Sequence, residues 1–178
     1  MFQLNEMFGK KVIVALLNFF LENPSKEFYE TQIRNKLKLA RASINKSLKF
    51  LTKSGILLVS QRGRMKVYKF NSDNPLNKQL KILKNVCDIL PELEILKNKY
   101  EIYLYGSSAR GEDLEDSDID ILVIGRHSDE IVDVLSKLEK KINRKIKPSF
   151  YTDIEWSQCA RKDYAFYERV EKDKIRLI

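Results

Sequence analysis

Two aspartates two positions apart, Asp118 and Asp120, are the residues whose types and spacing best suit chemistry in this sequence. They open an apolar run that continues to Ile124 and predicts a strand. Because side chains alternate along a strand, both carboxylates point to one face while Ile119 points to the other. Two hard oxygen ligands at a strand end suit Mg²⁺, which binds through few carboxylates together with substrate phosphates.

A Gly-Ser pair precedes these aspartates, directly after another apolar strand pattern at 101–105. Gly106 lets the backbone approach a phosphate closely, and Ser107 at a helix N-terminus can donate hydrogen bonds to it. The combination predicts a site for a metal ion and a phosphate group. A Walker A loop is excluded because Gly111 is followed by acidic residues. An EF-hand starting at Asp116 is excluded because its glycine and final glutamate are missing.

The order of these features resembles the nucleotidyltransferase superfamily related to polymerase β. The shared features are an apolar strand, Gly-Ser-x-Ala-Arg-Gly, an acidic spacer and then Ser-Asp-Ile-Asp. This form is similar to the small, minimal branch of that superfamily, and the likeness covers about residues 76–160. Members of that branch often pair with toxin-like helical proteins, and some are fused to winged helices.

The resemblance implies roles for six residues. Asp118 and Asp120 would ligate Mg²⁺, or Mn²⁺ in its place, and position a nucleoside triphosphate (NTP). The nucleotide would be held by Gly106, Ser107, Ser108 and Arg110. For Arg110 a purely structural ion pair is an equal alternative. The implied reaction is in-line attack of an acceptor hydroxyl, on a protein or nucleic acid, on the α-phosphorus.

One departure from the family pattern concerns the third carboxylate that active members carry on a following strand. The expected strand, 145–151, contains no acid, and Lys147 would repel a second metal. Asp153 and Glu155 lie just beyond and would substitute only if the strand register shifted. We therefore expect weak or absent transfer. A non-catalytic transcriptional regulator, antitoxin-like, that senses nucleotide or holds a partner remains the alternative.

The charge of the chain is unevenly distributed. The 178 residues carry a net charge of +8, yet residues 1–71 hold 14 Lys and Arg against 4 Asp and Glu. The rest holds 19 against 21. This asymmetry predicts a basic, nucleic-acid-binding N-terminal half, with a solvated basic surface as the alternative.

Periodicity in this half predicts helices near 12–23, 29–37 and 41–54, followed by strands at 56–59 and 66–70 that form a hairpin. Three helices and a basic hairpin resemble the winged helix-turn-helix domain of DNA-binding regulators, over about residues 8–70. Such domains also serve as protein-docking modules. The predicted contacts to duplex DNA lie on the third helix and the wing, at Arg41, Ser43, Asn45, Lys46, Lys49, Arg62, Arg64 and Lys66.

The expected class is α+β, with a winged helix at 1–72, a helical linker at 73–100 and a minimal nucleotidyltransferase domain with a short mixed sheet at 101–178. Pro91 should end or kink the linker helix. As an alternative to linking the two domains, this helix could pack between two copies of the chain in a homodimer. A single closing helix is expected from Trp156 to Ile178.

Several classes are excluded by composition. Two distant cysteines and the lone His127 argue against a disulfide framework, a Cys-rich zinc site and most histidine-based catalysis. The longest apolar run, Val12–Leu21, is too short for a bilayer span. A cytoplasmic protein without membrane contact is expected.

Overall fold

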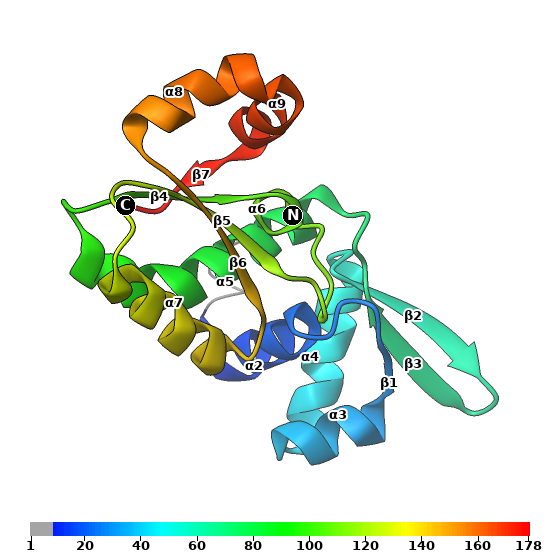
Figure 1. The fold of residues 1–178 in the computed structure, drawn as a ribbon. Coiled ribbons are helices and arrows are strands. Elements are labelled where there is room, and N and C mark those ends of the chain that lie inside the picture. The colour runs from blue at the N-terminus through cyan, green and yellow to red at the C-terminus, as the bar shows by residue number, and fades with distance from the viewer. Residues whose placement is uncertain (1–8) are drawn as a thin grey trace. The chain divides into compact units, whose positions relative to one another are not determined.

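The computed structural model describes residues 9–178, and the chain divides into two compact units between Lys78 and Gln79 (Figure 1). Helices and two small sheets make up the described part, so the α+β class is confirmed.

Three helices build most of the N-terminal unit: α2 (Lys11–Leu21), α3 (Glu30–Leu37) and α4 (Arg41–Lys53). Their bounds lie within three residues of the predicted ones. On α4, Ile44, Leu48 and Leu51 are buried on one face, as their spacing predicts. The same unit buries Phe20 of α2, whose ring meets that of Phe28 edge to face.

The small sheet of this unit has the order β1-β3-β2, with both pairs antiparallel. Its strands are β1 (Glu27–Tyr29), β2 (Leu57–Arg62) and β3 (Met65–Phe70). The predicted hairpin is present, with a tight turn at Gly63 and Arg64. Strand β1 was not predicted from the sequence, because three residues are too few to establish an alternating pattern.

Helix α5 (Pro75–Leu93) spans the boundary between the units. It begins at Pro75 because proline suits the first helical position and the Asn74 side chain accepts the Leu76 N–H, at 2.9 Å. The helix does not end at Pro91: it continues through Leu93 and becomes a 3₁₀ turn, η1 (Glu94–Leu96).

The C-terminal unit is built on a four-stranded mixed sheet with the order β6-β5-β4-β7. Its strands are β4 (Glu101–Tyr105), β5 (Ile119–Ile124), β6 (Ile146–Tyr151) and β7 (Ile175–Arg176). Strands β5 and β6 are parallel and the other pairs antiparallel. The parallel pair needs a crossover, which α7 (Asp129–Ile142) supplies; this helix was not predicted from the sequence.

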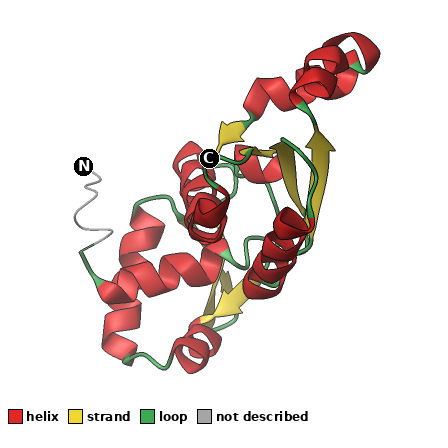
Figure 2. Cartoon of the chain, turned by 60° about the vertical axis from the view of Figure 1, so that its left-hand side comes forward, coloured by secondary structure: helices red, strands yellow, loops and turns green. Residues whose placement is uncertain are grey.

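Helices cover both faces of this sheet (Figure 1 and Figure 2). Helices α5 and α7 pack on the face that carries Ile102, Leu104 and Ile121. The opposite face carries Leu122 and Ile124, and it packs against α8 (Asp153–Lys162) and α9 (Tyr164–Asp173). The alternating pattern of the strands therefore decides which residues form each of the two cores.

The expected single closing helix is wrong: the tail forms α8, α9 and the short strand β7. Asp163 separates the two helices, and its side chain accepts the Phe166 N–H at 3.0 Å as an N-cap. Phe166 and Tyr167 pack against Trp156 on this face of the sheet. Tyr164 is 63% exposed.

No helix within residues 9–178 is both long and apolar enough to cross a membrane. Cys87 is exposed, Cys159 is buried, and both are free thiols.

Candidate active site

The turn after β4 brings the backbone of Gly106 against the Asp120 carboxylate. Gly106 has φ +72° and ψ −153°, and it precedes the short helix α6 (Ser107–Arg110). A Cβ atom added to Gly106 would lie 2.5 Å from Asp120 Oδ2. Glycine is needed here for two reasons. Other residues rarely adopt this φ, and a Cβ atom would displace the Asp120 carboxylate.

Asp120 lies near the start of β5, between the neighbouring strands β4 and β6. It pairs with Tyr105 on β4 and with Lys147 on β6. Asp118 lies just ahead of β5, two residues before Asp120; it contacts Lys147, and its charge acts on Asp120. Both side chains are partly exposed.

Lys147 forms an ion pair with the first of these carboxylates, with 2.5 Å between Lys147 Nζ and Asp118 Oδ2. This hydrogen bond holds the pKa of Asp118 below its usual range and raises the pKa of Lys147. The pKa of Asp120 is raised, chiefly by burial; the charge of Lys147 opposes that shift, and the charge of Asp118 adds to it. The two carboxylates therefore differ in how readily they ionise.

No acid joins these two carboxylates from β6. Ser149 lies on the same side of that strand as Lys147, and its hydroxyl is hydrogen-bonded to the Tyr105 hydroxyl at 3.1 Å. Asp153 and Glu155 follow the far end of β6, in the first turn of α8. The Glu155 carboxylate accepts the Thr152 N–H at 2.8 Å in a capping box, and this bond holds the pKa of Glu155 down. Across residues 9–178, no three His, Cys, Asp or Glu side chains gather as a metal site.

The residues after Gly106 differ in what they can reach. Ser107 is partly exposed, whereas Ser108 is fully buried, and its hydroxyl lies 3.5 Å from Arg144 Nη2. The Ser108 side chain therefore supports the turn and is not accessible to a nucleotide. Arg110 is exposed and pairs with Glu112 at 2.9 Å and with Asp173 of α9 at 2.5 Å. These two ion pairs are the structural alternative that the sequence left open for Arg110.

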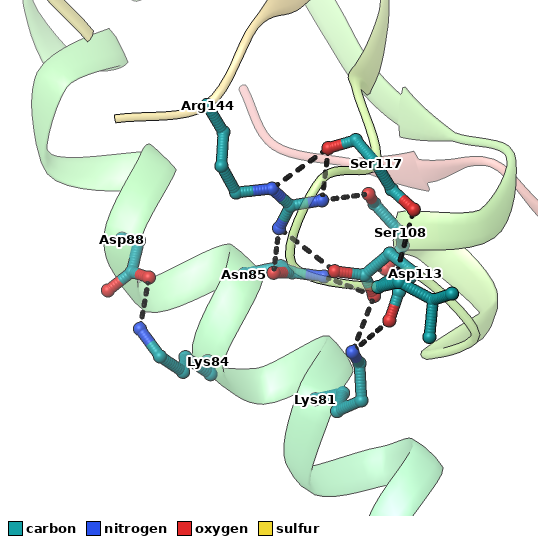
Figure 3. A network of polar contacts seen from close by, with 9 residues as sticks. Lys81, Lys84, Asn85, Asp88, Ser108, Asp113, Ser117 and Arg144 are labelled. Carbon is teal, nitrogen blue, oxygen red and sulfur yellow. Dashed lines mark hydrogen bonds and ion pairs between the residues drawn. The ribbon is translucent and has the colours of Figure 1, made fainter. Parts of the chain in front are cut away.

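A buried polar network that was not predicted from the sequence holds the loop between α6 and β5 (Figure 3). Asp113, only 3% exposed, accepts from Arg144 Nη1 at 2.9 Å and lies 3.4 Å from Lys81 Nζ. Arg144 also donates two hydrogen bonds to the Ser117 carbonyl, at 3.0 and 2.9 Å. Because Ser117 directly precedes Asp118, this network fixes where the Asp-x-Asp segment begins.

Asn85 completes the network from α5. Its Nδ2 donates to the Ser108 carbonyl at 3.0 Å and to Asp113 Oδ1 at 3.2 Å. Burial lowers the pKa of Lys81, an effect that Asp113 opposes. The signal available in the sequence was the spacing: Lys81 and Asn85 fall on the same stripe of α5 as the buried Ile89.

The N-terminal unit has a groove of about 930 Å³ between α3, α4 and the β2–β3 hairpin. Five of the eight predicted DNA contacts line it: Arg41, Asn45, Lys49, Arg64 and Lys66. Two more cations in the lining, Arg34 and Lys53, were not among the predicted contacts.

The other three predicted DNA contacts do not line this groove. Ser43 and Lys46 are exposed on α4, and Arg62 pairs with Glu27 of β1 at 2.5 Å. The Arg41 guanidinium lies 3.5 Å from Glu30, which also lines the groove.

Comparison with known proteins adds three findings. The family model described as "Nucleotidyltransferase domain" matches residues 81–174. This range includes the Gly-Ser turn at 106–107 and the aspartates Asp118 and Asp120. A relative from Methanocaldococcus jannaschii, named "Putative protein adenylyltransferase", is 37% identical; the match covers 33% of this chain and 79% of the relative. A solved structure, "Crystal structure of the toxin-antitoxin with AMP-PNP", is 22% identical with a TM-score of 0.39, covering 53% of this chain and 73% of that chain.

Proposed function

Because this chain belongs to the nucleotidyltransferase domain family, we propose that its C-terminal unit binds a nucleoside triphosphate together with one Mg²⁺ or Mn²⁺ ion. The observation that carries the proposal is the close approach of Gly106 to Asp120, which places the Gly-Ser turn directly beside a carboxylate that can hold a metal ion. Ser107 opens α6 beside it and can donate its hydroxyl to a phosphate oxygen.

The residues present fit one divalent ion. Asp118 and Asp120 are hard oxygen ligands on one strand side, and phosphate oxygens of the nucleotide would complete the coordination. Lys147 must release Asp118 for this, which an exposed ammonium can do at small cost. A bound ion would offset the negative charge that builds up on the phosphates during transfer.

The reaction supported by family membership is transfer of a nucleotide to a hydroxyl. The acceptor oxygen forms a bond to the α-phosphorus, the bond from that phosphorus to the bridging oxygen breaks, and pyrophosphate leaves with those electrons. The acceptor proton must leave as the bond forms. The name of the relative favours ATP as the nucleotide and a protein as the acceptor.

The position of Lys147 supports a second candidate function, in which the chain binds a nucleotide without transferring it efficiently. Its ammonium stands against Asp118 on the strand where the family resemblance expects a third carboxylate. Residues 9–178 place no third acid beside Asp118 and Asp120, so transfer would lack the carboxylate that could take the proton of the acceptor hydroxyl. The chain would then be a regulator that responds to nucleotide. A toxin-like helical partner and a homodimer remain predictions for this candidate.

The experiment for nucleotide binding compares the full chain with the double variant Asp118→Asn, Asp120→Asn. Calorimetry with ATP and Mg²⁺ should show binding to the natural chain and none to the folded double variant. Asp116→Asn is the matched control, since this acid lies in the same loop and is exposed. Unchanged affinity in the double variant would exclude the site. Incubation with α-labelled ATP and candidate acceptors then separates transfer from binding alone.

For the N-terminal unit we propose a winged-helix role in binding duplex DNA. The basic groove and the net charge of the first 71 residues support it, because DNA affinity comes largely from cations placed near phosphates. Helix α4 would enter the major groove, and the hairpin would contact the adjacent backbone.

Lys49→Ala and Arg64→Ala should each weaken duplex DNA binding by the full chain. The slope of log affinity against log salt should fall by about 0.9 for each phosphate that the variant no longer neutralises. Lys11→Ala is the control, an exposed lysine of α2 that does not line the groove. If all three variants bind alike, or if binding ignores salt, the proposal for this unit is wrong.

A further inference from the structure

One face of α9 borders the turn that begins at Gly106. Phe166, near the start of the helix, packs edge to face on Tyr105 with 6.0 Å between ring centroids. Asp173, at its end, pairs with Arg110 Nη1 at 2.5 Å. Tyr105 directly precedes Gly106, and Arg110 is the last residue of α6. Helix α9 is therefore attached to both ends of the turn.

Arg169 lies between these two anchors. It follows Phe166 by three residues and precedes Asp173 by four, so all three side chains project from one side of the helix. The Arg169 guanidinium carbon lies 5.3 Å from the centre of the Phe166 ring, which fixes the direction of the side chain. The anchors on either side place this guanidinium alongside the turn from Gly106 to Arg110.

The cations around the turn are not equally available to a ligand. Lys147 is paired with Asp118, and Arg110 is paired with two carboxylates. Arg169 is exposed, and no carboxylate within residues 9–178 forms an ion pair with it. It also acts through its charge on Asp120, opposing the rise that burial causes in the pKa of that carboxyl.

We propose that Arg169 is a phosphate-binding residue that completes the nucleotide site from α9, contacting the β- or γ-phosphate of a nucleoside triphosphate. This inference rests on the proposed nucleotide-binding function. A guanidinium suits the task because it stays charged and presents paired N–H donors to phosphate oxygens. Stacking on Phe166 holds it in advance of binding, which lowers the entropy cost of forming the contact.

The test is calorimetry on the full chain with two probes, ATP and inorganic tripolyphosphate, each with excess Mg²⁺. Arg169→Gln should weaken binding of both probes by about tenfold or more, the range for a hydrogen bond to a charged group. Arg169→Lys should lose less, since it keeps the charge. Arg161→Gln is the matched control, an exposed arginine on α8, and should bind both probes as the natural chain does.

Each outcome has a separate meaning. If the natural chain binds neither probe, the proposed nucleotide site fails. If it binds them and Arg169→Gln binds them equally well, the role of Arg169 alone is refuted. A loss for ATP without a loss for tripolyphosphate also refutes it, because the contact would then be to the nucleoside. Melting temperatures within a few degrees of the natural chain verify folding, and Arg169→Lys serves if the glutamine variant unfolds.

Discussion

The ammonium of Lys147 lies 2.5 Å from the carboxylate of Asp118, on the strand beside the one that carries Asp120. The protein thus places a positive charge of its own against one of the two carboxylates proposed to hold a divalent ion. Asp120 is cross-strand from the same lysine. The candidate site is therefore partly neutralised before any ligand arrives.

Removing this lysine should strengthen binding of a divalent ion in the absence of nucleotide. The ammonium competes with a divalent ion for the Asp118 carboxylate, so Lys147→Ala should raise Mn²⁺ affinity by a few-fold. Titration followed by electron paramagnetic resonance measures it. Lys145→Ala is the control, because Lys145 adds charge near Asp118 without an ion pair to it. A gain no larger than that of the control would contradict the proposed competition.

The two carboxylates should titrate in a defined order. Lys147 lowers the pKa of Asp118, whereas burial raises that of Asp120 above its ordinary value of 3.8. On acidification Asp120 therefore takes up its proton first, and divalent-ion binding should weaken as the pH falls through the pKa of Asp120.

Carboxyl ¹³C NMR on the natural chain and on Lys147→Ala checks this order. The variant should show a higher pKa for both groups, because the lysine charge lowers each of them. Asp118 should move further, since it loses a hydrogen bond as well as a nearby charge. If Asp118 titrates above Asp120 in the natural chain, the electrostatic description is wrong.

Gly106→Ala should abolish nucleotide binding and also destabilise the chain. The added Cβ would stand 2.5 Å from Asp120 Oδ2, and a non-glycine residue at this φ costs about 1–3 kcal/mol. Calorimetry with ATP and Mg²⁺ measures the first effect, and urea unfolding measures the second.

Gly63→Ala separates the strain from the clash. Gly63 also has a positive φ, +61°, but nothing lies within 4 Å of an added Cβ. This variant should lose stability through backbone strain alone, by less than Gly106→Ala, while binding nucleotide normally. Normal binding by Gly106→Ala would show that the close approach to Asp120 has no role in the site.

Asp113→Asn should be among the most destabilising single changes in the C-terminal unit. It leaves Lys81 buried without its counter-ion and removes the charge that Arg144 pairs with. Breaking a buried ion pair from one side costs about 3–5 kcal/mol. The free energy of unfolding is measured by urea titration, with the fluorescence of Trp156 as the signal. Trp156 is the only tryptophan of the chain and a core residue of this unit.

Lys97→Ala provides the comparison for a surface pair. Lys97 and Glu94 are each 61% exposed, so loss of their ion pair should change stability by less than about 1 kcal/mol. If both variants lose similar amounts, the network around Asp113 does not stabilise the loop that precedes Asp118.

Local patterns along the chain were enough to predict the central elements and the two motifs. The apolar run of β5 is visible as a strand pattern directly after Asp118, and the apolar stripe of α4 is visible as a helical repeat. These features depend on residues within a few positions of each other, and strand and helix geometry then dictates where their side chains point. Short elements such as β1 and the break at Asp163 lack enough residues for a pattern.

By itself, the sequence determined the pair of carboxylates, the Gly-Ser turn before them and the basic charge of the first 71 residues. Only the tertiary structure decided what meets them: Lys147 against Asp118, Asp113 between Lys81 and Arg144, and α9 beside the turn. These contacts join residues that are far apart along the chain. Their partners are chosen by strand register and by the packing of helices on the sheet, and neither leaves a periodic signal in the sequence.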